Sequence, residues 1–166
     1  MKTMPLTQGY EAIVDEIDYP DVSRWKWYAL VKRRRSKEVR TVYAVRGTYM
    51  NGKQTKIWLH RYMLQLTDPH IECDHRDGNG LNNQRENLRI ATHVQNNRNR
   101  RKCLHTSSRF KGVSWYRPAR VWQAHITKGG KVKNLGCFAN EIDAAMAYNI
   151  AATQHFGEYA LLNDLS

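Results

Sequence analysis

The segment that most constrains the fold of this chain is residues 71–97, where acidic, imidazole and amide side chains recur at short intervals among turn residues. A short strand that ends at Asp74 and His75 would present these two side chains on opposite faces. The Asp-Gly-Asn-Gly run at residues 77–80 contains the residue types that favour a reversal of the chain. We therefore expect a strand followed by a tight turn, with the Asp-His pair at the end of the strand.

A helix is expected shortly after this turn region, because Thr92 followed three residues later by Gln95 is a capping-box pattern. Such a helix carries Asn96 in its first turn or just after it. Asp74 and Asn96 could then converge on one hard cation, because Mg²⁺ accepts carboxylate and amide oxygens and fills its other positions with water and substrate phosphate. The pattern thus predicts Mg²⁺ (or Mn²⁺) and no organic cofactor.

His75 is the expected catalytic base. An imidazole that is neutral near pH 7 can take a proton from a water molecule aimed at a scissile phosphorus. This requires that the other ring nitrogen is held by an acceptor, either the side-chain oxygen of Asn87 or a backbone carbonyl. The cation would stabilise the pentacovalent charge and the departing 3′ oxygen.

The spaced pattern Asp-His, Asn-x-x-x-Asn-Leu-Arg, Thr and Asn, within about residues 58–100, resembles the HNH endonuclease family, especially its phage and intron-encoded homing branch. The resemblance implies a ββα-metal (His-Me finger) core in which Asp74 and Asn96 are the metal ligands. It also implies that His75 is the general base and that Asn87 orients it. Many family members have histidine at the last metal position, where this chain has Asn96.

Three further residues are expected to support this centre, namely His60, Arg89 and His93. His60 lies upstream of the motif, and we interpret it as a hydrogen-bonded support rather than a direct catalyst. His93 lies one turn before Asn96 on the expected helix and could approach the metal. Two alternatives stay open: a purely structural Asp-His pair, and an inactive nuclease that retains the fold.

The chain carries a net charge of +12 and has a sequence pI near 9.8, which is typical of proteins that bind a polyanion. The charge is spread rather than concentrated in a tail, with +6 over residues 1–60 and +3 over each of residues 61–105 and 106–166. We expect much of the molecule to lie along its ligand, double-stranded DNA.

The N-terminal segment, residues 1–57, alternates in period two and has a turn at Asn51-Gly52, which predicts antiparallel strands. Its basic run at residues 32–35 falls in an expected hairpin loop, where phosphate contact is slightly favoured over plain solvation. The DNA-binding candidates in this run are Arg33, Arg34 and Arg35.

A basic linker is expected at residues 101–108, directly after the nuclease core at residues 58–100. A basic linker between two DNA-contacting modules can follow the phosphate backbone or the minor groove. The DNA-binding candidates in and before this linker are Arg98, Arg100, Arg101 and Lys102.

Residues 109–166 predict three short strands and a helix capped by Asn140. The side chains expected on the buried face of these strands are Val113, Trp115, Trp122, Ala124, Ile126 and Leu135. Over about residues 109–163 the segment resembles the AP2 DNA-binding domain, in its Gly-Val, Trp-x-Ala-x-Ile and Leu-Gly-x-Phe motifs and its Ala-rich helix. A narrow sheet can enter the major groove and present polar side chains to base edges. The candidate DNA contacts are Lys111, Ser114, Tyr116, Arg117, Arg120, Gln123, His125 and Lys133.

The sequence therefore predicts an α+β protein in which a β-rich N-terminal segment, a nuclease core and an AP2-like three-stranded sheet with one helix follow one another. The predicted function is a site-specific DNA endonuclease of the homing type that nicks its target. One alternative is an AP2-type transcription regulator with a vestigial nuclease fold, and another is an RNA-binding or ribosome-associated basic protein. We expect a monomer in the cytoplasm of a bacterial host cell, encoded by a phage or mobile element. No membrane association is expected, because no stretch approaches bilayer-spanning length.

Overall fold

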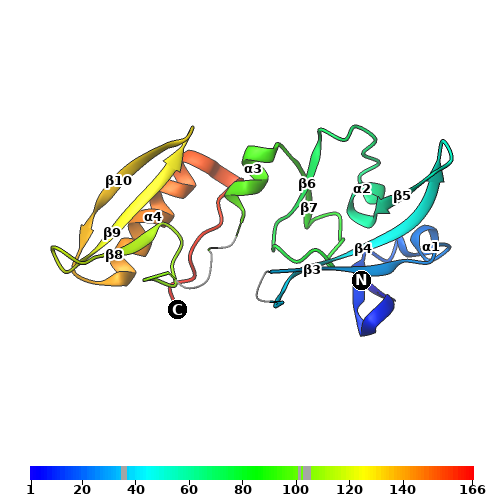
Figure 1. Ribbon diagram of the computed structural model, residues 1–166, viewed down its shortest axis with the longest axis horizontal. Helices are drawn as coiled ribbons and strands as arrows, with labels where there is room; N and C mark the ends of the chain where they lie inside the picture. Colours follow the sequence, from blue (N-terminus) through cyan, green and yellow to red (C-terminus); the bar gives the residue numbers. More distant parts are fainter. Residues whose placement is uncertain (35–36, 101, 103–105) are drawn as a thin grey trace. The chain divides into compact units, whose positions relative to one another are not determined.

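Figure 1 shows the computed structural model of the chain, which describes residues 1–34, 37–100, 102 and 106–166. The chain divides into two compact units, Met1–Asn96 and Asn97–Ser166. Both units combine short antiparallel strands with helices, an architecture compatible with the α+β class. No helix in the described part of the chain is both long and apolar enough to cross a lipid bilayer.

The first unit begins with two antiparallel strands, a short helix and a three-stranded antiparallel sheet of order β3-β4-β5. These elements are β1 (Lys2–Pro5), β2 (Glu11–Val14), α1 (Tyr19–Val22), β3 (Tyr28–Arg33), β4 (Val39–Met50) and β5 (Lys53–Trp58). The turn expected between β4 and β5 is confirmed. Asn51 and Gly52 have φ angles of 50° and 73°, the geometry that favours Asn-Gly in a two-residue hairpin.

The second half of this unit contains a short helix, two strands joined by a long loop, and a second helix. A short helix, α2 (Leu59–Met63), leads to the hairpin of β6 (Glu72–His75) and β7 (Leu88–Ala91), and α3 (His93–Arg98) follows. The expected capping box is confirmed, because Gln95 N donates to Thr92 Oγ1 at 3.2 Å and Thr92 N donates to Gln95 Oε1 at 2.8 Å. Strand β6 also ends at His75 as expected.

One hydrophobic core runs from the N-terminal strands to β7. Its buried members are Met4, Ala12, Val14, Val22, Trp27, Ala44, Leu59, Met63 and Leu88. Leu59 and Leu88, which flank the β6–β7 region, share this core with side chains from β1, β2 and β4. Residues 1–57 and the hairpin therefore fold as one unit.

The loop between β6 and β7 is fixed to the N-terminal strands by backbone contacts. Ile13 N donates to Leu81 O at 2.8 Å, and Asn83 N donates to Ile13 O at 2.7 Å. Gly80 lies so close to β4 that an added Cβ would be 2.4 Å from the Val42 carbonyl oxygen. The loop thus depends on the absence of a side chain at Gly80.

We predict that Gly80→Ala lowers the free energy of unfolding by about 1–3 kcal/mol, because the new methyl group must push the loop away from the β4 backbone. Urea unfolding monitored by circular dichroism measures this loss. Gly47→Ala is the matched control, since its Cβ would meet nothing closer than Gln54 Nε2 at 3.9 Å. Equal stabilities of the two variants would contradict the close approach of the loop.

The second unit contains an antiparallel sheet of order β10-β9-β8 and one longer helix. Its elements are β8 (Val113–Tyr116), β9 (Val121–Lys128), β10 (Lys131–Phe138) and α4 (Glu141–Phe156). The expected helix cap is confirmed, because Asp143 N donates to Asn140 Oδ1 at 2.8 Å. On the expected inner face of the sheet, Val113, Ala124 and Ile126 are buried, whereas Trp115, Trp122 and Leu135 are half-buried.

Small side chains on α4 let the helix pack closely on this sheet. Ala144 and Ala145 share one buried cluster with Phe110 and Val113, as expected from the Ala-rich pattern. Gly112 contributes to the same packing, because an added Cβ would lie 2.0 Å from the Tyr148 ring. The helix therefore supports the inner face of the sheet.

Candidate nuclease site

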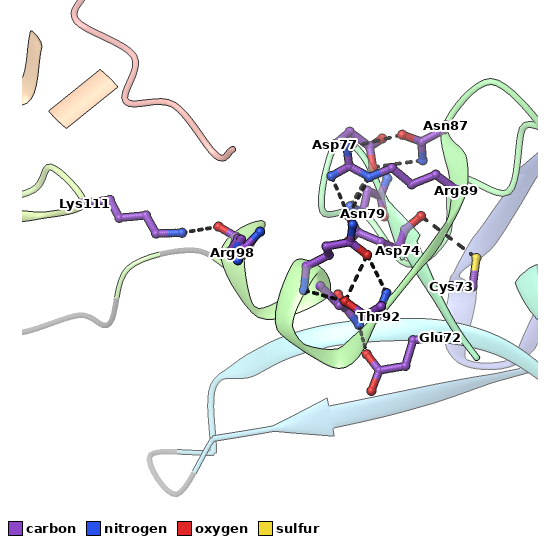
Figure 2. Close-up of polar contacts among 12 residues, drawn as sticks. Glu72, Cys73, Asp74, Asp77, Asn79, Asn87, Arg89, Thr92, Arg98 and Lys111 are labelled. Atoms are coloured by element: carbon purple, nitrogen blue, oxygen red, sulfur yellow. Dashed lines mark hydrogen bonds and ion pairs between the residues drawn. The ribbon is translucent and has the colours of Figure 1, made fainter. Parts of the chain in front are cut away.

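The β6–β7 hairpin brings the predicted metal ligand Asp74 opposite the predicted supporting residue Arg89. These two residues are directly paired in the antiparallel register. Arg89 Nε and Nη2 both donate to Asp74 Oδ2, at 2.9 and 2.6 Å (Figure 2). Both side chains are 6% exposed, so this is a buried, charge-assisted contact that fixes the carboxylate on one face of the hairpin.

His75, the predicted base, lies at the end of β6 and is buried with only 6% exposure. Burial lowers the pKa of its imidazole below the ordinary 6.5, while the Asn83 side chain and the charges of Asp77 and Asp74 act in the opposite direction. The ring is therefore neutral at pH 7. A neutral imidazole has one ring nitrogen that can accept a proton, which is what a general base requires.

Aromatic rings surround His75 on the side of the N-terminal sheet. The His60 ring packs edge-on against it with centroids 5.1 Å apart, and Tyr43 lies 5.9 Å from it. Burial, followed by the neighbouring His75, lowers the pKa of His60 to about 3. His60 thus contacts the predicted base through its ring. Its Nδ1 has no hydrogen-bond partner among the described residues, so the expected hydrogen-bonded support is not seen at this atom.

Helix α3 is attached to β6 through Glu72, a residue that the sequence interpretation did not include. Asn96 Nδ2 donates to Glu72 Oε2 at 2.6 Å, and His93 Nδ1 lies 2.7 Å from Glu72 Oε1. These hydrogen bonds, that of Asn96 first, lower the pKa of the Glu72 carboxyl. Glu72 and Asp74 are two residues apart on β6 and so share one face of the strand, which brings Asn96 to the face that carries Asp74.

Asn87 holds the loop that follows His75. Its Oδ1 accepts from Asp77 N at 3.1 Å, and its Nδ2 donates to Asp77 Oδ1 at 3.0 Å (Figure 2). The same Nδ2 also donates to Asn82 O at 2.8 Å. Its side-chain amide is thus engaged with the loop. Any orienting effect of Asn87 on the His75 ring would act through the position of this loop.

Asn83 is a second residue near the site that sequence reasoning did not single out. It is fully buried, its Nδ2 donates to Leu81 O at 3.0 Å, and its side chain influences the pKa of His75. The one sequence signal for it is the first Asn of the Asn-x-x-x-Asn-Leu-Arg pattern. Its burial depends on the contact between the loop and β2, which no local pattern predicts.

The donor atoms on this face fit a hard divalent cation. Asp74 offers a carboxylate, and the Asn96 amide gives its nitrogen to Glu72, so its oxygen turns away from Glu72. Across the described residues no group of three or more His, Cys, Asp or Glu side chains is arranged to hold a metal. A cation here would therefore be held by two protein oxygens, with water and phosphate filling the other positions.

The predicted DNA-binding residues of the first unit border the hairpin between β3 and β4. Arg33 Nη1 donates to Lys37 O at 3.0 Å, and Arg34 N donates to Glu38 O at 2.9 Å. Arg35 lies outside the described residues, as does Arg101 farther along the chain. The ammonium nitrogen Nζ of Lys32, the first residue of the basic run, lies 5.0 Å from the centroid of the Trp58 ring.

Two lysines that were expected to contact DNA are engaged with backbone carbonyls inside the second unit. Lys102 Nζ donates to Phe110 O at 2.5 Å and to Val113 O at 2.7 Å. Lys111 Nζ donates to Arg98 O (Figure 2). It also donates to Arg100 O at 2.8 Å. Burial lowers the pKa of Lys111 to about 8. These ammonium groups hold the start of the second unit together.

The remaining candidates lie at the end of α3 and on the sheet of the second unit. Arg98 packs over the Phe156 ring at 4.6 Å. Ser114 and Gln123 are paired across β8 and β9 and are half-buried, as is His125, whereas Tyr116 and Lys133 are exposed. Arg117 and Arg120 lie in the β8–β9 turn, where Arg120 N donates to Arg117 O at 3.3 Å.

The family of this chain follows from a relative that matches nearly all of it. The chain is 33% identical over 163 residues to the uncharacterized HNH endonuclease L560 of Acanthamoeba polyphaga mimivirus, a match that covers 95% of this chain and 77% of the relative. This chain belongs to the HNH endonuclease family.

Two phage proteins match shorter stretches. Protein 3.8 of Escherichia phage T7 is 38% identical over 61 residues, which cover 37% of this chain and 50% of that protein. The H-N-H endonuclease F-TflI of Escherichia phage T5 is 34% identical over 56 residues, which cover 30% of this chain and 29% of that enzyme. No family model matches the chain, and no solved structure matches it.

The pKa of His60 predicts a pH dependence of stability. Its folded-state pKa of about 3 lies below the unfolded value of 6.5, so the folded protein binds fewer protons between these values. Stability should therefore fall as the pH drops below 6.5, by up to about 1.4 kcal/mol per pH unit from this group.

Urea unfolding from pH 7 to pH 4 of the wild type and of His60→Phe measures this contribution. The Phe variant keeps an aromatic ring at this position but cannot titrate, so its stability should fall less steeply with decreasing pH. Parallel pH profiles for the two proteins would show that His60 is not held neutral in the folded state.

Proposed function

We propose that this chain is a site-specific DNA endonuclease of the homing type, which hydrolyses phosphodiester bonds with one divalent cation and with His75 as general base. The observation that carries the proposal is the position of a buried, neutral imidazole at the end of β6, next to Asp74 on the opposite face. Membership of the HNH endonuclease family supports it.

His75 would take a proton from the attacking water. The carboxylates of Asp77 and Asp74 favour the protonated ring electrostatically, so they would stabilise the imidazolium formed when that proton is transferred. These charges would offset part of the cost of burial, which disfavours the charged ring and lowers the pKa of His75. As the water oxygen bonds to phosphorus, the bond between phosphorus and the 3′ oxygen would break, and the departing 3′ oxygen would take a proton from solvent. The ring would then return its own proton to solvent before the next turnover.

Asp74 and Asn96 would hold the cation, which is Mg²⁺ or Mn²⁺ in this proposal. When bound, the cation supplies positive charge that stabilises the phosphate as negative charge develops on it. Arg89 would keep the Asp74 carboxylate in place through its two hydrogen bonds, and Asn87 would keep the loop after His75 in place.

The second unit would select the DNA site. Its outer sheet face carries polar side chains on strands β8 and β9, and the β10 edge carries the exposed Lys133. We assign this unit an AP2-like role, in which the sheet enters the major groove and its side chains meet base edges. One nuclease centre per monomer would then nick one strand near the bound site.

A supercoiled-plasmid assay with Mg²⁺ or Mn²⁺ tests the nuclease proposal. We predict that His75→Ala reduces the nicking rate by about 10²–10⁴-fold, the usual contribution of a general base. His70→Ala is the control, because His70 is exposed and precedes the same strand. Nicking should also require the metal and stop with a chelator.

A different result of the same assay would favour the regulator. If the wild type binds DNA at nanomolar concentration but nicks no plasmid with either metal, the chain acts as a DNA-binding regulator with an inactive nuclease fold. If RNA competes for binding better than duplex DNA at a fixed salt concentration, neither DNA-directed function holds.

Lys133→Ala tests whether the β10 edge of the second unit contacts DNA. Lys133 is exposed and is paired with Ile126, so its side chain lies on the helix side of this edge strand. Loss of one phosphate contact should weaken DNA binding across sequences and reduce the slope of log affinity against log salt concentration by about one. Fluorescence anisotropy at several salt concentrations measures both quantities. The control is Lys2→Ala, since Lys2 is ion-paired with Glu16 in the first unit. If the slope of log affinity against log salt concentration is unchanged in Lys133→Ala, the DNA does not contact Lys133.

A further inference from the structure

We infer that Glu72 is a positioning residue that sets the orientation of the Asn96 side-chain amide and so presents its oxygen to the cation. The inference rests on the proposed metal site. It assigns a function to a residue outside the Asp-His pair and outside the motif that identifies the family.

The position of Glu72 follows from the register of the hairpin. Glu72 is paired with Ala91, the last residue of β7, and helix α3 begins two residues later at His93. This register brings the Glu72 side chain next to the first turn of α3. It lies on the same face of β6 as Asp74, because side chains two residues apart point to the same side of a strand.

The contacts of Glu72 divide its two oxygens between two partners. Asn96 Nδ2 donates to Oε2 at 2.6 Å, and His93 Nδ1 lies 2.7 Å from Oε1. Glu72 is partly shielded, with 31% of its side chain exposed, whereas the His93 side chain is 76% exposed. Each oxygen of the Glu72 carboxylate therefore has its own partner, His93 for Oε1 and Asn96 for Oε2.

An ionised carboxylate can only accept hydrogen bonds, so it can bind the nitrogen of the Asn96 amide but not its oxygen. A cation has the opposite requirement, since it binds the oxygen and is repelled by the N–H groups. Glu72 therefore excludes the flipped amide, in which the nitrogen would face the cation. Partners that orient a metal ligand in this way are typically worth 10-fold to 100-fold in metal affinity.

Glu72→Gln is the informative substitution, because it keeps the shape of the side chain but removes this selection. A glutamine amide can accept from Asn96 Nδ2 or donate to Asn96 Oδ1, so both orientations become possible. Glu86→Gln is the matched control. It removes the same charge from an exposed position just before β7, where the Glu86 side chain makes no hydrogen bond or ion pair with another described residue.

The first experiment titrates Mn²⁺ into the protein without DNA and follows free Mn²⁺ by electron paramagnetic resonance. We expect the Kd of Glu72→Gln to be at least 10-fold above that of the wild type and of Glu86→Gln. In the plasmid assay, the Mn²⁺ concentration for half-maximal nicking should rise by the same factor. The rate at saturating Mn²⁺ should change by less than about threefold, because His75 is untouched.

A double-mutant cycle with Asn96→Ala tests whether Glu72 acts through Asn96. In the Asn96→Ala background, Glu72→Gln should change the Kd by less than twofold, since no amide remains to be oriented. Additive effects would overturn the inference, because Glu72 would then act on the cation directly. A Kd for Glu72→Gln within twofold of Glu86→Gln would overturn it too, even if the thermal stability falls, because Glu72 would then only attach α3.

The experiments distinguish a failure of the proposed metal site from a failure of the role assigned to Glu72. A wild type that neither binds Mn²⁺ nor nicks DNA rules out the metal site itself, and with it this inference. A wild type that does both, combined with a Glu72→Gln variant that behaves like Glu86→Gln, overturns only the role of Glu72.

Discussion

The antiparallel register of β6 and β7 is the constraint on which the rest of the site depends. It pairs Asp74 with Arg89, and two N–H groups of the guanidinium meet one carboxylate oxygen where both side chains are buried. Removing charges from water is costly, so such a pair is tolerated only with good hydrogen-bond geometry. A shift of one residue would move Asp74 to the opposite face and separate Glu72 from α3.

The N-terminal strands supply the apolar core that the β6–β7 hairpin lacks. Two strands of four residues are marginal alone in water, since they bury little apolar surface. Here Leu88 enters the core built by β1, β2 and β4, and the long loop bonds to Ile13. Tyr43 of β4 and His60 of α2 pack against His75, so the N-terminal strands stabilise the hairpin and, together with α2, keep the imidazole buried and neutral.

Features that depend on a few neighbouring residues could be predicted from the sequence. The Thr92–Gln95 capping box and the Asn51-Gly52 turn are confirmed because their hydrogen bonds and φ angles are set within four residues. The Glu72–Asn96 contact joins residues 24 apart and depends on strand register, so no local pattern reveals it. The carbonyl contacts of Lys111 were missed for a related reason: a basic residue next to a basic linker resembles a phosphate contact until the fold supplies other acceptors.

The proposed one-metal mechanism requires that Asp74 and Asn96 meet at one cation beside His75. Anomalous diffraction from crystals soaked in Mn²⁺ tests this directly, because the anomalous signal locates the ion itself. The proposed mechanism predicts one strong anomalous peak within about 2.3 Å of a carboxylate oxygen of Asp74 and of Asn96 Oδ1, as expected for an oxygen-ligated divalent cation. A peak bound by other side chains, or an Asn96 oxygen directed away from the ion, would contradict it.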